Sequence, residues 1–176
     1  MIRGRPFGLL ARGLLAGLLA ALLMTVAMLL LRLFAGVPLP AELIGDRFLP
    51  LLPVDLFLDM LTMLGGPIMA KQLAFFSGFA NAVALGAILG LGYSFVVERQ
   101  GGDAGFVRRS VLIVAPGVLA LWFLTVAVLW PVLDSSYVGL PPGWALVASL
   151  AGFLVFYTLY GTTLVVAYAA TRSEIR

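Results

Sequence analysis

The sequence contains neither cysteine nor histidine. Without cysteine the chain has no disulfide, no thiolate-bound zinc and no iron–sulfur cluster of its own. Without histidine it lacks the usual acid–base imidazole and the axial ligand of histidine-bound haem or chlorophyll. We therefore expect no cofactor bound through His or Cys. This excludes hydrolases that depend on either side chain, and it excludes a cytochrome b-type subunit that acts alone.

Charge is also scarce. Charged residues make up 11% of the 176 residues, whereas a soluble domain carries roughly 25%. Hydrophobic residues make up 62%, and the mean hydropathy is +1.13. A water-soluble protein of this size cannot bury so much apolar side chain, so its solvent must be lipid. The length fits a single membrane domain over residues 1–176.

Four long apolar runs are the main positive signal. Each is long enough, as a helix that rises 1.5 Å per residue, to cross a hydrocarbon core of about 30 Å. The sequence therefore predicts an all-α integral membrane protein with four transmembrane helices. The expected spans cover about residues 9–35, 68–97, 110–130 and 144–170. The first is too long for the apolar part of a signal peptide, so we expect it to be an uncleaved span.

The first outer loop, residues 38–67, is the longest polar interruption, and its first part is expected to be a proline-bounded loop. That part carries the charged residues Glu42, Asp46 and Arg47. Just before the loop, Arg32 ends the first span, where its long stem can reach the headgroups. The loop therefore gathers much of the charge of the chain on one side of the membrane.

The second part of this loop has a helical pattern. Asp55, Asp59 and Thr62 recur at i, i+4 and i+7, which places them on one helical face, and apolar residues cover the remainder. The segment is too short to span a bilayer. We therefore predict a short interfacial amphipathic helix within the loop.

The cations give an orientation. If the N-terminus is cytoplasmic, eight of the 11 Lys and Arg residues fall on the cytoplasmic side and three on the other. The eight are Arg3, Arg5, Arg12, Arg99, Arg108, Arg109, Arg172 and Arg176, and the three are Arg32, Arg47 and Lys71. The positive-inside rule then predicts a multi-pass protein of the bacterial cytoplasmic membrane with both termini cytoplasmic. The net charge of +3 is read as this topology signal, and nucleic acid is not expected as a partner.

Small residues form ridges on two of the expected spans. In the second span they recur every four residues, at Gly78, Ala82, Gly86 and Gly90, and the first span has a shorter ridge. That shorter ridge consists of Gly13 and Gly17. Small residues at this spacing let helices approach closely in lipid. We expect these six residues to pack helices together.

Five polar residues are candidates for contact with a partner or a lipid. Asp55 and Asp59 form a carboxylate pair that is expected to be a solvated face, with a docking surface as the next interpretation. Lys71 and Gln72, at the mouth of the second span, are expected to anchor it, or to bind an anionic lipid headgroup or a quinone carbonyl. Should Lys71 lie deeper, Asp55 or Asp59 is the expected partner. Asn81, deep in that span, is expected to hydrogen-bond to a neighbouring helix.

One family resemblance is present. The runs GVPLPAELIGDRFLPLLP and LGGPIMAKQLAFF, over about residues 36–76, resemble the N-terminal membrane region of certain bacterial molybdopterin-dependent oxidoreductases of the sulfite-oxidase type. In that family several spans precede a soluble catalytic domain. No part of this sequence corresponds to the molybdenum-binding region, so no catalytic residue is carried over. The resemblance implies a membrane module that works beside a redox or electron-transport partner.

The sequence has no catalytic or metal-binding motif, so we expect no enzyme activity. Our hypothesis is a non-catalytic membrane subunit that anchors or assembles a larger complex, respiratory or photosynthetic, with other membrane subunits and lipids as its partners. Contact with a lipid, a quinone or a carotenoid is left open. The alternative is a small transporter or channel, which needs polar groups that converge at the middle of the bilayer and often has broken helices. Only Asn81 and Pro116–Gly117 favour it.

Overall fold

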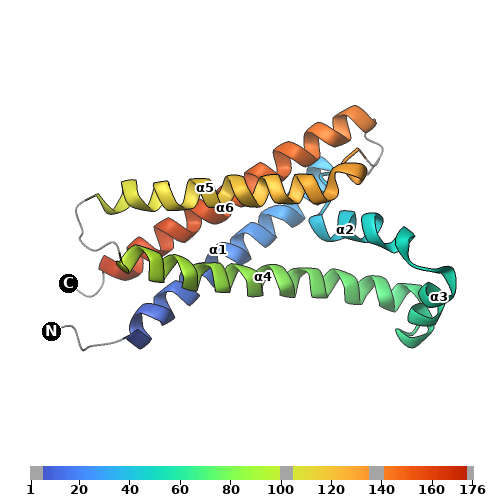
Figure 1. Ribbon diagram of the computed structural model, residues 1–176, viewed down its shortest axis with the longest axis horizontal. Helices are drawn as coiled ribbons and strands as arrows, with labels where there is room; N and C mark the ends of the chain where they lie inside the picture. Colours follow the sequence, from blue (N-terminus) through green and yellow to red (C-terminus); the bar gives the residue numbers. More distant parts are fainter. Residues whose placement is uncertain (1–5, 100–104, 135–140, 174–176) are drawn as a thin grey trace.

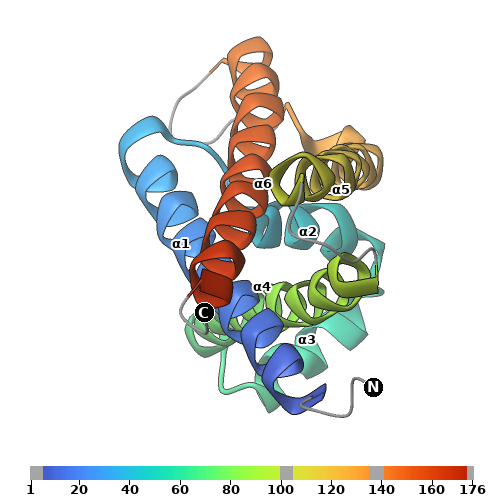
Figure 2. The ribbon, with the colours of Figure 1, turned by 90° about the vertical axis from the view of Figure 1, so that its left-hand side faces the viewer.

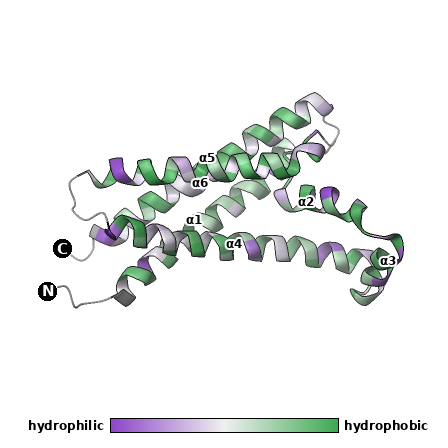
Figure 3. Ribbon diagram, in the orientation of Figure 1, coloured by the Kyte–Doolittle hydropathy of each residue, from purple (hydrophilic) through white to green (hydrophobic). Residues whose placement is uncertain are grey.

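The computed structural model describes residues 6–99, 105–134 and 141–173 (Figure 1). Every regular element in these ranges is helical. Four helices are long and apolar enough to cross a membrane, namely α1 (Pro6–Ala35), α4 (Pro67–Arg99), α5 (Phe106–Leu129) and α6 (Pro142–Ser173). Figure 3 shows that apolar residues predominate along all four. The predicted all-α membrane fold with four spans is therefore confirmed, and α5 continues through Pro116 as one helix.

Helix α1 lies at the centre of the bundle. It packs against α4 and against α6, and α5 packs on α6 (Figures 1 and 2). The core is built mainly from small residues and methionines of α1 and from aromatic residues of α6. Its members include Ala16, Ala20, Ala21, Met24, Phe153, Phe156, Tyr160 and Leu164. The small side chains of α1 leave room for the large rings of α6, and this complementarity brings the two helices together.

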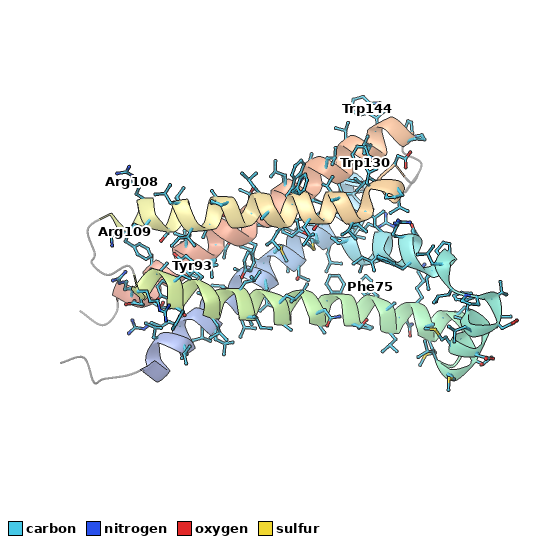
Figure 4. All side chains as sticks on the ribbon, viewed as in Figure 1. Phe75, Tyr93, Arg108, Arg109, Trp130 and Trp144 are labelled. Atoms are coloured by element: carbon cyan, nitrogen blue, oxygen red, sulfur yellow. The ribbon has the colours of Figure 1, made fainter. Side chains whose placement is uncertain are left out.

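The two ends of the bundle differ in their residues. The start of α1 and the end of α6 lie at one end, which we call the termini end, and α3 lies toward the other, the α3 end (Figure 1). Figure 4 shows Arg108 and Arg109 at the termini end and Trp130 and Trp144 toward the α3 end. Both tryptophans are exposed, as expected of residues that sit at a membrane–water boundary.

The segment between α1 and α4 contains two α-helices and not one. Helix α2 (Pro40–Phe48) and the 3₁₀ turn η1 (Leu49–Leu51) precede the expected helix, which is α3 (Val54–Met63). The prediction of a proline-bounded loop over Glu42, Asp46 and Arg47 is therefore wrong, because these residues lie in α2. Pro40 occupies the first turn, where its missing N–H costs nothing, and Leu43 is fully buried.

Helix α3 lies where the Asp55–Asp59–Thr62 spacing predicts it. None of its residues is buried, and Thr62 Oγ1 donates to the Asp59 carbonyl at 2.7 Å. Gly65 and Gly66 end it with φ of 81° and 99°, a conformation that strains residues with a side chain. The Gly66 N–H donates to the Leu61 carbonyl at 2.8 Å and closes the turn. Helix α3 is thus held at its ends and has little packing along its length.

An ion pair joins α1 to α2. Arg32 Nε lies 3.0 Å from Glu42 Oε2, and the other oxygen of that carboxylate accepts from Arg32 at 3.1 Å. Glu42 also accepts the Leu39 N–H at 3.0 Å, which satisfies a donor at the start of α2. The guanidinium of Arg32 therefore has a carboxylate partner in the same chain, and its reach to the headgroups stays a prediction.

Replacing Glu42 with alanine should loosen α2 without unfolding the bundle. The change removes the ion pair and the acceptor of the Leu39 N–H, and because both side chains are partly exposed we expect a loss of about 1 kcal/mol. Amide hydrogen exchange should quicken in α2 and stay unchanged in α6. Glu42→Gln keeps an oxygen acceptor for the Leu39 N–H, so its exchange rate in α2 should lie between those of the parent chain and Glu42→Ala. Equal exchange in α2 of Glu42→Ala and the parent chain would contradict this role.

Candidate functional site

The N-terminal half of α4, residues 67–85, is less buried than the C-terminal half, although Phe79, Ala82 and Val83 pack against the core. The buried residues of α4 all come later in the helix and are Gly86, Ala87, Gly90, Tyr93, Ser94 and Val97. Between residues 67 and 85 no residue is buried, and the helix extends from the bundle toward α3 (Figure 1). This half contains Lys71, Gln72 and Asn81, three of the five predicted contact residues. We therefore take it as the candidate site.

The small residues of the two predicted ridges explain how α4 is held. A Cβ on Gly17 would lie 2.5 Å from the Gly86 carbonyl oxygen and 2.9 Å from Gly90 Cα. A Cβ on Gly90 would overlap the Gly13 carbonyl oxygen and lie 2.6 Å from Gly17 Cα. The backbones of α1 and α4 thus touch at these four glycines. The sequence predicts such packing residues, and the structure shows which of them face each other.

The same ridge contacts a second element farther along α4. A Cβ on Gly78 would lie 2.8 Å from Ala41 Cβ of α2, and Ala82 is partly buried against the core. Helix α2 therefore contacts α4 at Gly78, on one side of the N-terminal half of α4. The contact fixes the direction of this half of the helix.

Polar side chains at the termini end pair with one another. The Tyr93 hydroxyl donates to Ser110 Oγ at 2.7 Å, and the Tyr168 hydroxyl donates to Glu98 Oε1 at 3.2 Å. The rings of Tyr93 and Tyr168 meet edge to face with centroids 5.3 Å apart. Figure 4 shows Tyr93 extending from α4 toward α5. These pairs join α4 to α5 and α6, and the sequence offered only the position of the tyrosines near span ends as a signal.

Three further hydrogen bonds lie within the bundle. The Tyr160 hydroxyl donates to the Gly86 carbonyl at 2.7 Å, and Trp122 Nε1 donates to the Leu150 carbonyl at 2.9 Å. Thr125 Oγ1 and the Tyr157 hydroxyl are 2.7 Å apart. These polar groups bind one another or the backbone, and so they stabilise helix packing. Among the described residues, the buried side-chain oxygen that has no partner is that of Thr25.

Lys71 and Gln72 lie on a groove along the N-terminal half of α4. The groove has a volume of about 600 Å³ and is lined by Pro67, Ile68, Lys71, Gln72, Phe75 and Phe76. Figure 4 shows Phe75 extending from α4 toward α2. An ammonium group and an amide beside an apolar groove can bind a headgroup or a carbonyl while the groove takes the chain attached to it.

The two carboxylates of α3 do not serve Lys71. Asp55 and Asp59 are exposed, and no ion pair joins either of them to Lys71 in the described parts of the chain. Such a pair is expected only for a buried Lys71, and Lys71 is exposed. On α2, partial burial raises the pKa of the Asp46 carboxyl, and the negative charge of Glu42 raises it further. In residues 6–99, 105–134 and 141–173, no group of three or more acidic side chains is placed to hold a metal.

Asn81 is exposed on α4 and makes no hydrogen bond within the described ranges. It lies about 21 Å from the start of α4 and about 27 Å from its end, at 1.5 Å per residue, and so near the middle of the span. The spacing from Gly86 and Gly90 places it on the helical face away from α1. No helix in the described parts of the chain bonds to it, so the bond to a neighbouring helix stays a prediction.

Comparison with known proteins gives no match to any family model, curated protein or solved structure. The resemblance of residues 36–76 to a membrane region of molybdopterin-dependent oxidoreductases thus stays a prediction. The function has to be argued from the residues of the N-terminal half of α4.

Proposed function

We propose that the chain is a non-catalytic membrane subunit, an anchor or assembly component of a larger complex, which meets its partner through the N-terminal half of α4. The observation that carries this proposal is Asn81. Its amide lies near the middle of a membrane-spanning helix, on the exposed face, with no hydrogen-bond partner in the described parts of the chain.

An amide in this position is costly in lipid. Its NH₂ offers two donors and its oxygen offers two lone pairs, and lipid tails satisfy none of them. Moving an unpaired amide from water into a hydrocarbon costs roughly 4–8 kcal/mol. A helix of another subunit that presents a polar group at the same depth recovers part of this cost. The position of Asn81 therefore favours a protein neighbour over bulk lipid.

The position of the polar groups favours a subunit over a transporter. A transport site needs polar groups that converge inside the bundle near the middle of the bilayer. Here Asn81 faces away from α1, whereas Tyr157, Tyr160 and Trp122 inside the bundle are bonded to other groups of the chain. The bundle thus supplies rigid support, and its exposed helix supplies the contact surface.

The sequence supports a membrane orientation and a class of partner for the proposed complex. The excess of arginine at the termini end supports an orientation with both termini in the cytoplasm of a bacterial cell. The resemblance of residues 36–76 supports an electron-transport partner. The groove beside Lys71 and Gln72 supports contact with an anionic lipid or a quinone, because it combines a cation and an amide with an apolar surface.

The proposal is tested by replacing Asn81 with leucine and extracting the chain from its native membrane in mild detergent. The parent chain should migrate as a larger particle whose components mass spectrometry identifies. Asn81→Leu should weaken that association about 3- to 30-fold, because an interhelical hydrogen bond contributes about 0.6–2 kcal/mol.

The matched control is Thr162→Leu, which replaces an exposed polar residue of α6 whose hydroxyl bonds to its own helix at 2.8 Å. This variant should leave the particle unchanged, since its face carries no unpaired amide. A parent chain that leaves the membrane alone, as a monodisperse single copy, would refute the proposed function.

A further inference from the structure

The face of α4 that carries Asn81 also has a regular spacing. Six of its residues follow one another at intervals of four, three, four, three and four positions. They are Ala70, Ala74, Ser77, Asn81, Ala84 and Ile88, and we call them the Asn81 seam. All six are exposed except Ala70, which is half-buried. The average interval is about 3.6 residues, the repeat of an α-helix, so the six residues lie along one face of α4.

The seam lies opposite the face of α4 that packs on α1. Gly86 and Gly90 face α1, whereas Gly78, three residues before Asn81, faces α2 beside the seam. The seam residues are themselves exposed or half-buried. Five of the six have small or short side chains, so a second helix can approach closely there. The Ser77 hydroxyl bonds to the Ala74 carbonyl of its own helix at 3.0 Å and needs no partner.

We infer that the seam pairs with the same seam of a second copy of this chain. The inference rests on the proposed function, because it names the partner that satisfies Asn81. An amide both donates and accepts, so two Asn81 side chains can bond to each other. Copies inserted in one orientation place this residue at one depth, and a two-fold axis along the membrane normal brings the two seams together in register.

The amide, and not the small residues, selects this partner. A stripe of small residues alone fits many helices and also lipid. A single Asn at a seam position favours the one alignment in which it meets a polar group, and an identical helix supplies that group without any further requirement. The other exposed polar residues of the span, Lys71 and Gln72, lie on the groove side and take no part in this contact.

The absence of cysteine makes the inference directly testable. Single cysteines are placed in the seam, as Ala74→Cys, Ser77→Cys and Ala84→Cys, and off the seam, as Ile68→Cys and Phe76→Cys, two positions that are also exposed. The full chain is then oxidised in its native membrane. We expect the seam variants to form a disulfide-linked species of twice 18.7 kDa and the off-seam variants to stay single.

A second variant separates specific pairing from collision. Asn81→Leu in the Ser77→Cys chain should weaken pairing about 3- to 30-fold, and Asn81→Gln, which keeps an amide, should restore most of it. Equal cross-linking on and off the seam, or no effect of Asn81→Leu, would overturn the inference. If the seam cysteines form disulfides only with a different protein, the seam does not pair with a second copy of this chain, and the proposed function still holds. Seam cysteines that trap nothing would overturn the second copy, because each copy carries the introduced cysteine, while the proposed function is judged by the extraction experiment.

Discussion

Gly90→Val is expected to separate α1 from α4 and to destabilise the bundle by about 3 kcal/mol, at the upper end of what overpacking usually costs. A Cβ at this position would overlap the Gly13 carbonyl oxygen and lie 2.9 Å from Gly17 N. These are backbone atoms, which cannot rotate away as the end of a side chain can, so the helices must move apart. Denaturant unfolding in detergent micelles, followed by circular dichroism, measures the loss.

Gly92→Val on the same helix is the matched control. A Cβ at Gly92 would have no atom within 4 Å, and the residue is exposed, so this change should leave the stability of the bundle within a few tenths of a kcal/mol. Both variants add the same side chain to the same helix, which removes helix propensity as an explanation. Similar unfolding curves for the two variants would show that the glycine crossing does not hold α1 and α4 together.

Tyr168→Ala is expected to cost about 3–5 kcal/mol, as for other large-to-small changes in a core. Tyr168 is among the largest fully buried side chains, and its ring meets Tyr93 edge to face and stacks on Phe106 with centroids 6.3 Å apart. The alanine variant would leave a cavity where α4, α5 and α6 converge. The same unfolding measurement should therefore show a large loss.

Tyr168→Phe separates packing from hydrogen bonding. It keeps the ring and removes only the hydroxyl that donates to Glu98, so the loss should be about 1 kcal/mol. If the phenylalanine variant were as unstable as the alanine variant, the hydrogen bond to Glu98, and not the ring packing, would hold the termini end together.

The spans were predictable from the sequence because hydropathy is a local property. Helix α2 was not, because its formation depends on contacts that sequence patterns do not reveal. Pro40 sits at the start of the helix, and Glu42 is fixed by Arg32, ten residues earlier in the chain. Local propensity therefore gave a loop where tertiary contacts stabilise a helix.

The site was predictable only in part. The glycine spacing identified Gly86 and Gly90 as packing residues, but a regular spacing does not show which helix packs against them. Once α1 is placed on these glycines, the direction of Asn81 follows from helical geometry. The interval pattern from Ala70 to Ile88 can be read in the sequence, yet α4 also carries the glycine ridge, and only the structure shows which of the two is covered.

The divergence of α4 from α5 and α6 toward the α3 end has a consequence for the surrounding bilayer. The helices are drawn together at the glycine crossing, and α2 and α3 add further chain on the side where α4 stands apart. The bundle is therefore wider toward the α3 end, where α4 stands apart from α5 and α6, than at the glycine crossing (Figure 1). Lipids pack around such a wedge with least strain where the bilayer bends toward its narrow side, so the chain is expected to gather in curved regions of its membrane.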